Sequence, residues 1–171
     1  MKQVLRTRAH HALRPIALAL LTSAIFAASA CQGGAPAAKQ GGGATWGDAK
    51  LVRPAELAAA LADTTKPRPL LLHVGVRALY RQGAIPGSQY VGAGSDPAGI
   101  DGLLAALKDQ PKDRDVVIYC GCCPAVHCPN MKPAWAAVRD AGFTNVHALW
   151  IEQNFDADWA NHGYPTEKPG L

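Results

Sequence analysis

Residues 115–130 read DVVIYCGCCPAVHCPN, an apolar run followed by a loop that holds four of the chain's five cysteines. The run that ends at Tyr119 has the length and composition of a strand. From Met131 to Val138, apolar residues recur at the spacing of one helix face. The sequence therefore predicts a strand-to-helix turn at the cysteines, where backbone N–H groups and the helix dipole favour anions such as thiolates.

Strand and helix patterns alternate along the rest of the chain. Leu70 to Val74 is a continuous apolar run, typical of a strand buried on both faces of a parallel sheet. Similar patterns predict strands at 89–91 and 145–149, helices that begin near residues 54, 77 and 97, and a last short helix at 155–161. This alternation predicts an α/β fold: a parallel sheet with helices on both faces and right-handed crossovers.

Ligands of such sheets bind beyond the carboxyl ends of the strands. His73 lies near the end of one predicted strand and Cys120 at the end of another, so we expect both at one edge of the sheet. Arg77 follows closely and could attract an anionic substrate to this cleft, although a surface arginine is the ordinary expectation. His73 is either a residue of this cleft or a hydrogen-bonded structural histidine.

The first thirty residues carry four basic residues and no acidic one, and end in a largely apolar stretch from Ile16 to Ala30. This pattern predicts a signal peptide over residues 1–30. The apolar stretch is shorter than the roughly 20 residues that span a membrane. We therefore expect an exported protein that resides in the periplasm or the cell envelope.

Residues 28–31 read Ala-Ser-Ala-Cys and allow two interpretations. The first is a cleavage site of a soluble exported protein. The second is a lipobox-like signal, in which Cys31 is lipidated and holds the protein at the membrane. Residues 31–45 are a Gly/Ala-rich tether with the composition of a flexible linker, which favours the lipid anchor. Residues 46–171 are then one domain.

The chain has 17 basic and 13 acidic residues, but four basic residues lie in the predicted signal peptide, which leaves 13 of each sign. The mature protein is therefore neutral. Nucleic-acid binding needs a basic face, so we expect no nucleic-acid partner.

Four segments of the chain match a known family in order and spacing. They are GAIPGS at 83–88, VVIYC at 116–120, AGFTNV at 141–146 and WANHGYP at 159–165. They resemble the G-H-I-P-G-A motif, the strand ending in the active cysteine, the G-F-x-x-V motif and the W-x-x-x-G-x-P ending of the rhodanese-like domain family. Between Leu51 and Pro165, the chain therefore resembles a single rhodanese-like domain.

The resemblance implies a sulfurtransferase without a cofactor, in which a Cys120 thiolate takes sulfane sulfur from a small donor. The resulting persulfide passes the sulfur to a thiol acceptor. The chain departs from the family at Ala125, where an arginine is frequent, and at His73, where an aspartate is common. Without that arginine, thiosulfate is not favoured as the donor, and phosphate transfer is disfavoured for the same reason.

The residues of the loop also allow other chemistry. Cys120 and Cys123 form a C-x-x-C pair, which suits thiol–disulfide exchange. Soft thiolates and imidazoles suit copper(I) or zinc, and His73 on the neighbouring strand could add a ligand. The loop residues available to such a site are Cys120, Cys122, Cys123, His127 and Cys128. In an exported protein, Cys123 and Cys128 could instead form a structural disulfide, and His127 could be a solvated loop residue.

Overall fold

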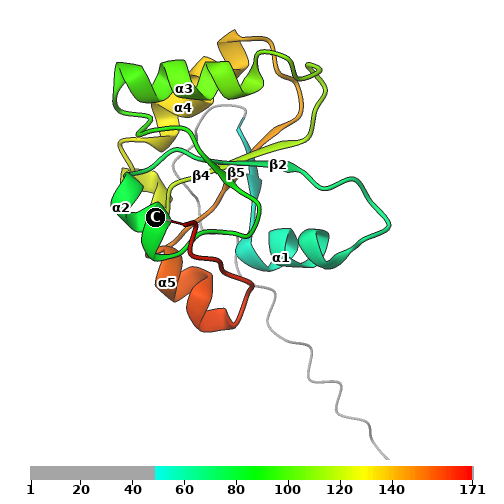
Figure 1. The fold of residues 1–171 in the computed structure, drawn as a ribbon, viewed down its shortest axis with the longest axis vertical. Coiled ribbons are helices and arrows are strands. Elements are labelled where there is room, and N and C mark those ends of the chain that lie inside the picture. Colours follow the sequence, from blue (N-terminus) through cyan, green and yellow to red (C-terminus); the bar gives the residue numbers. More distant parts are fainter. Residues whose placement is uncertain (1–48, 171) are drawn as a thin grey trace, which may run out of the picture. The chain divides into compact units, whose positions relative to one another are not determined.

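The computed structural model describes residues 49–170, so the predicted signal peptide, the tether and Cys31 lie outside the described residues (Figure 1). The elements are, in chain order, β1 (Lys50–Val52), α1 (Pro54–Ala62), β2 (Leu70–His73), α2 (Arg77–Gln82), β3 (Gln89–Tyr90), α3 (Pro97–Leu107), β4 (Val116–Tyr119), the 3₁₀ helix η1 (Ala125–His127), α4 (Met131–Asp140), β5 (Val146–Leu149), α5 (Phe155–Asp158) and the 3₁₀ helix η2 (Ala160–His162). Within residues 49–170, no helix has the length and apolar character needed to cross a membrane.

The five strands form one parallel sheet in the order β1-β5-β4-β2-β3. All four residues of β4 are buried, as expected for a central strand whose neighbours β2 and β5 pair with it on both sides. His73 at the end of β2 is in register with Tyr119 at the end of β4. The two strands therefore end at the same edge of the sheet, which confirms that His73 and Cys120 are neighbours.

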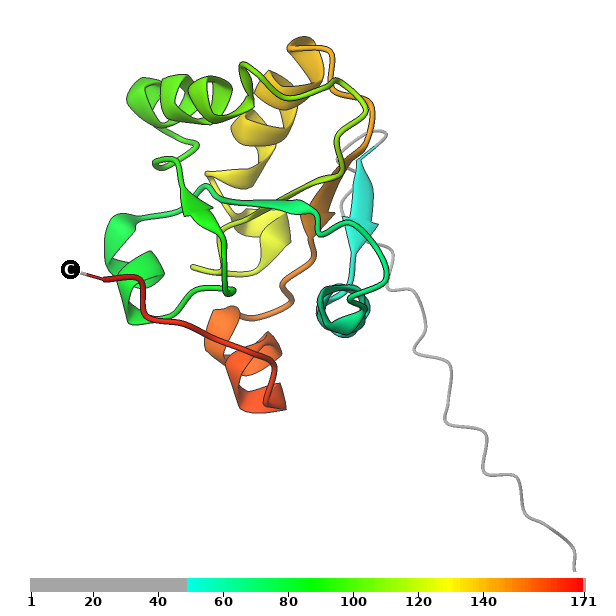
Figure 2. The same ribbon diagram turned by 45° about the vertical axis from the view of Figure 1, so that its right-hand side comes forward.

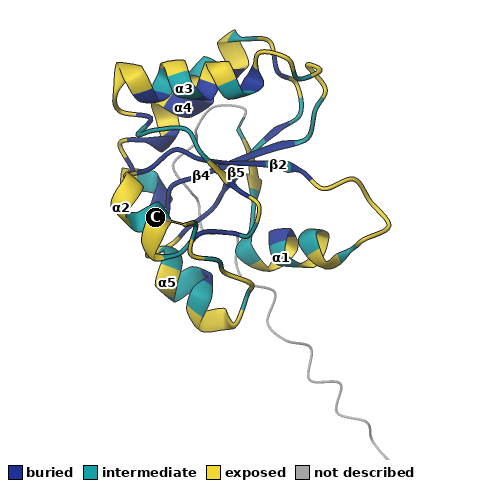
Figure 3. Cartoon of the chain, viewed as in Figure 1, coloured by how far each residue is buried: buried dark blue, intermediate teal, exposed yellow. Residues whose placement is uncertain are grey.

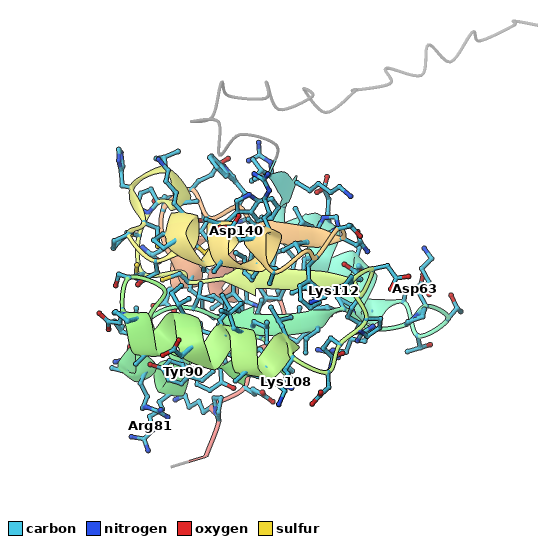
Figure 4. All side chains as sticks on the ribbon, turned by 90° about the horizontal axis from the view of Figure 1, so that it is seen from above. Asp63, Arg81, Tyr90, Lys108, Lys112 and Asp140 are labelled. Carbon is cyan, nitrogen blue, oxygen red and sulfur yellow. The ribbon has the colours of Figure 1, made fainter. Side chains whose placement is uncertain are left out.

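Helices cover both faces of the sheet, as the sequence predicts. Helices α3 and α4 lie on one face and α1 and α5 on the other, and both ribbon views show this arrangement (Figures 1 and 2). Seen from above, α3 and α4 lie side by side over the strands (Figure 4). Each face has its own apolar core, with Leu103 and Val138 in the first and Leu57 and Trp159 in the second. The three central strands between them, β2, β4 and β5, are largely buried (Figure 3).

The predicted helix at 155–161 is wrong in one respect, because it divides into α5 and η2 at Trp159. Trp159 leaves the helical conformation, with φ −125° and ψ −66°. Its indole is fully buried and donates a hydrogen bond from Nε1 to the Pro165 oxygen at 2.8 Å. Burying this large side chain stabilises the fold more than one continuous helix would, because a helix of so few residues has little stability of its own.

Candidate functional site

The cysteine loop begins directly after β4 and is fixed by the segment that follows β5. Gly121 turns the chain with φ +79°, and a Cβ there would lie 2.8 Å from the Phe155 Cβ, so only glycine fits. The Phe155 amide donates to the Gly121 oxygen at 2.9 Å, and the Ala125 amide donates to the Ile151 oxygen at 2.8 Å. The loop then passes through η1 and enters α4 at Met131, so the predicted strand-to-helix turn is confirmed but is long.

The loop brings four free thiols together. The Sγ of Cys122 lies 3.2 Å from that of Cys120, 3.1 Å from that of Cys123 and 3.7 Å from that of Cys128. Cys122 is therefore at the centre of the group. No disulfide joins Cys123 and Cys128, and the Cys120 sulfur contacts that of Cys122, which is not its C-x-x-C partner.

His73 supports the loop from the neighbouring strand. It is buried, its Nε2–H donates to the Cys120 oxygen at 3.0 Å, and its Nδ1 accepts from the Gly75 amide at 3.3 Å. Burial lowers the pKa of His73 to about 4, against a smaller opposing effect of the Cys120 hydrogen bond, so the ring is neutral. Both ring nitrogens are hydrogen-bonded, as in a structural histidine, and the ring also belongs to the cleft, because it lines the cavity at Cys120.

Gly75 lets His73 and the Cys120 sulfur approach each other. A Cβ at this position would lie 2.7 Å from the Cys120 Sγ and 2.8 Å from the His73 Cε1. Three tyrosine rings enclose the imidazole, with ring centroids 4.9–5.9 Å away: Tyr80, Tyr90 and Tyr119. The strand-end environment of Cys120 is therefore tightly packed around a neutral histidine.

Cys120 opens onto a cavity of about 270 Å³. Its lining residues are His73, Leu79, Gln82, Gly83, Cys120, Gly121, Cys122, Asn154, Phe155 and Asp156. The lining has one carboxylate, that of Asp156, and no lysine or arginine. Of the four loop cysteines, Cys120 and Cys122 reach the cavity, whereas Cys123 and Cys128 do not line it.

Two predicted site residues lie elsewhere. Arg77 stacks its guanidinium over the Tyr90 ring, 4.3 Å from the centroid, and lines a different cavity, so the structure does not bring it to Cys120. His127 is exposed at the end of η1, as expected for a solvated loop residue. Neither side chain contributes charge to the cavity of Cys120.

The ionisation of the loop differs from the expectation for Cys120. The pKa of the Cys128 thiol is lowered to about 5. The largest cause is the hydrogen bond from Cys120, and the amides of Asn130 and Met131 at the start of α4 lower it further, whereas burial opposes the shift. The pKa of Cys120 is raised, by that same bond and by burial. Burial and the hydrogen bond to Cys122 raise the pKa of Cys123 to about 12. The turn does stabilise a thiolate, but at Cys128.

A family model described as "Rhodanese-like domain" matches residues 53–150. The chain belongs to the rhodanese-like domain family. The recognition and the single-domain α/β fold predicted from the motifs are thereby confirmed. A comparison with curated proteins gave no match.

Solved structures include similar rhodanese-like domains. The solution structure of the rhodanese-like domain of the Alr3790 protein from Anabaena shares 25% identity, with a TM-score of 0.52, and the match covers 68% of this chain and 77% of that one. The BH2092 protein from Bacillus halodurans is 18% identical, with a TM-score of 0.53 over 70% of this chain and 77% of that one. The second likeness shows the fold alone.

A third structure is described as a possible tyrosine phosphatase from Rhodopseudomonas palustris. It is 20% identical, with a TM-score of 0.50, and the match covers 70% of this chain and 85% of that one. In the present chain, Ala125, the fifth residue after Cys120, is buried in η1. No lining residue of the cavity is cationic, so the lining lacks the positive charge that phosphoryl transfer uses.

Two residues of the site, Asn130 and Asp156, were not predicted from the sequence. Asn130 is buried, donates from Nδ2 to the Cys120 Sγ at 3.4 Å and accepts at Oδ1 from the Ser95 amide at 3.1 Å. Its place just before a predicted helix could have marked it, because asparagine is favoured there. Asp156 carries no comparable signal, because only the course of the chain after β5 brings it to the cavity.

Proposed function

We propose that this rhodanese-like domain is an exported sulfurtransferase that passes sulfane sulfur through a persulfide on Cys120. One observation carries the proposal: Cys120 follows the central strand β4 and reaches the cavity of about 270 Å³. Among the four loop cysteines, Cys120 is the one that matches the family's active cysteine. Membership of the family supports sulfur transfer as the class of chemistry.

The first step is attack on the donor. The Cys120 thiol is hydrogen-bonded to the Cys128 thiolate. As the Cys120 sulfur attacks the outer sulfur of a persulfide donor R–S–SH, its proton passes to Cys128, the bond between the two donor sulfurs breaks, and R–S⁻ leaves with that electron pair. The product is Cys120–S–SH, so Cys128 acts as the general base and Cys120 as the nucleophile.

The second step returns the protein to its starting state. The thiolate of an acceptor attacks the outer sulfur of the persulfide, and the sulfur–sulfur bond breaks toward Cys120. The acceptor leaves as its own persulfide, and the Cys120 thiolate recovers the proton held by Cys128. The donor and the acceptor use the same small cavity in turn, because Cys120 lines only that cavity among those described.

The charge of the cavity favours particular donors. Asp156 is the one charged lining residue, and no cation balances it. A dianion such as thiosulfate meets repulsion there, whereas a neutral or cationic small persulfide does not. We therefore infer that the donor is a small organic persulfide rather than thiosulfate.

The location is part of the proposal. The basic and apolar residues before Cys31 support export, and the Gly/Ala-rich segment after it supports a lipid anchor in the cell envelope. Cys31→Ala in the full-length chain should move the protein from the membrane fraction to the soluble fraction. An unchanged distribution contradicts the anchor.

Mass spectrometry tests the transfer step. The reduced full-length chain is incubated with a small persulfide, the unreacted thiols are alkylated, and peptide fragmentation locates the added sulfur atom. We expect one added sulfur on Cys120, none in Cys120→Ser, and release of that sulfur when a thiol acceptor is added.

Cys123→Ser is the matched control, because Cys123 belongs to the same loop but does not line the cavity. It should retain the adduct. An adduct that persists in Cys120→Ser, or one that is absent from the wild-type chain, rejects the proposed function.

A further inference from the structure

The four loop thiols divide into a compact group of three and a fourth outside it. The Sγ atoms of Cys120, Cys122 and Cys128 all lie within 4.8 Å of one another, and Cys123 does not belong to this group. Two sulfurs bound to one ion through metal–sulfur bonds of about 2.3 Å lie about 3.8–4.0 Å apart. The observed contacts of 3.2 and 3.7 Å are close to that spacing, so small side-chain rotations make room for an ion.

We propose that Cys120, Cys122 and Cys128 bind one copper(I) ion through three thiolate sulfurs. Thiolates are soft ligands and select copper(I) or zinc. Structural zinc sites are almost always four-coordinate. No fourth donor joins this group among residues 49–170, because the Cys123 sulfur does not lie within 4.8 Å of all three, both nitrogens of His73 are hydrogen-bonded and His127 is exposed. Three thiolates can complete the coordination of copper(I), so this donor set fits copper(I) better than zinc.

Hydrogen-bond donors around the sulfurs offset the negative charge of such a site. The Asn130 side chain and the Cys122 amide donate to the Cys120 sulfur, and the amides of Asn130 and Met131 donate to the Cys128 sulfur. The Ser95 amide holds the Asn130 oxygen, which fixes the direction of its NH₂ group. These contacts form a second shell that orients the ligands, as in established metal sites.

The surroundings of the group are suited to a soft, oxidisable ion. Cys120 and Cys128 are buried in the apolar core beneath α3 and α4, with Met131 and Ala134 beside them. Cys122 is only half-buried and lines the cavity together with Cys120. The ion can therefore be delivered from the cavity and then held where water is largely excluded.

Competition with a chromophoric copper(I) chelator tests the site. The reduced full-length chain, kept free of oxygen, should take up one copper(I) ion from the chelator. Cys122→Ser and Cys128→Ser should each weaken binding at least about 100-fold, and Asn130→Ala about 10-fold, which is the lower range for loss of a second-shell contact. X-ray absorption should show three sulfur neighbours around the copper.

Cys123→Ser and Cys31→Ser are the matched controls and should bind copper(I) as the wild-type chain does. The proposal is overturned if Cys123→Ser weakens binding as much as Cys122→Ser, if stoichiometric binding depends on Cys31, or if four sulfurs surround the copper. Circular dichroism checks that the variants are folded. Should Cys128→Ser not fold, Cys122→Ser decides alone, because Cys122 is half-buried and contributes less to the core.

The copper proposal does not rest on sulfur transfer. Its experiment contains no sulfur donor and measures affinity and coordination, so it can succeed where the persulfide experiment fails. The two functions are also linked by a consequence that can be measured. Copper(I) bound to Cys120 occupies the nucleophile, so the copper-loaded chain should form no persulfide until a chelator removes the metal.

Discussion

The two ends of the cysteine loop differ in what their surroundings provide. Cys120 lies at the end of a central strand, beside a neutral histidine, and reaches the cavity. Cys128 lies at the start of α4, receives two backbone amides and does not line the cavity. Access to the cavity is therefore provided at one end of the loop, and stabilisation of negative charge at the other.

This separation shows how a long loop changes the chemistry of a strand-to-helix turn. In a short turn, one cysteine can occupy the strand end and also receive the amides of the helix start. Here seven residues lie between Cys120 and Cys128, and the amides of Asn130 and Met131 donate to the second cysteine. The hydrogen bond between the Cys120 and Cys128 side chains connects the two ends of the loop.

Loss of Cys128 has the largest expected effect on this arrangement. In Cys128→Ser, no thiolate remains to take the proton of Cys120, so persulfide formation should slow about 100-fold, the lower range for loss of a general base. Raising the pH should restore part of the rate. The ultraviolet absorbance of the thiolate, which in the wild-type chain should disappear as the pH falls through about 5, should be missing near pH 7.

Cys123→Ser is the control for this experiment and should keep both the rate and the titration near pH 5. A thiolate that still titrates near pH 5 in Cys128→Ser would show that the charge resides on another sulfur, and the contrast between the loop ends would then be wrong.

The pH dependence of stability tests the neutral histidine at the Cys120 end. The unfolded chain binds a proton at His73 below about pH 6.5, whereas the folded protein binds it only near pH 4. Stability from this group is therefore present above pH 6.5 and is lost as the pH falls toward 4, by about 3 kcal/mol in total. Denaturant unfolding at pH 7 and pH 4.5 should show a smaller loss in His73→Gln than in the wild-type chain.

The exposed His127 provides the comparison for His73. His127→Gln is the matched control variant, because it also replaces a histidine by glutamine but at an exposed position. Equal pH dependence in His73→Gln and the wild-type chain means that His73 is not held neutral by its surroundings.

Gly75→Ala tests how tightly the Cys120 end is packed. The new Cβ would lie within 3 Å of both the Cys120 Sγ and the His73 Cε1, so these groups must move. We expect a loss of about 1–3 kcal/mol in the free energy of unfolding, typical of overpacking. Gly83→Ala is the control, because its Cβ would meet only an ordinary contact of 3.6 Å to Phe155. Equal stability of the two variants would contradict the close approach.

The smallest expected effect concerns the charge of the cavity. Asp156→Asn removes the one carboxylate of the lining and should raise the rate with thiosulfate a few-fold, while the rate with a neutral persulfide stays unchanged. The gain should shrink at high salt, because screening already weakens the repulsion. An equal change for both donors would mean that Asp156 acts on the structure of the site rather than through its charge.

The sequence allowed the sheet and the neighbourhood of His73 and Cys120 to be predicted, for a physical reason. Strands such as Leu70–His73 and Val116–Tyr119 are continuous apolar runs, which mark burial on both faces. Parallel strands end at one edge, so residues that follow them meet whatever their separation along the chain. The family motifs led to the same fold independently.

The distribution of charge within the loop could not be predicted in this way. Which sulfur receives the amides of Asn130 and Met131 depends on the path of the loop, and the spacing of its cysteines does not determine that path. The hydrogen bonds of the two His73 nitrogens likewise depend on where the chain places the Cys120 oxygen and the Gly75 amide. Sequence patterns report burial and periodicity, whereas these features depend on the direction of individual hydrogen bonds.

The hydrogen bonds from the segment after β5 have a consequence for the order of assembly during synthesis. Ile151 and Phe155 fix the loop at Ala125 and Gly121, and residues 154–156 form one wall of the cavity. All of these lie beyond the family match, which ends at residue 150. A growing chain therefore presents its four loop thiols roughly thirty residues before the wall that encloses them, so the loop can reach its final path only after residues 151–156 have been made.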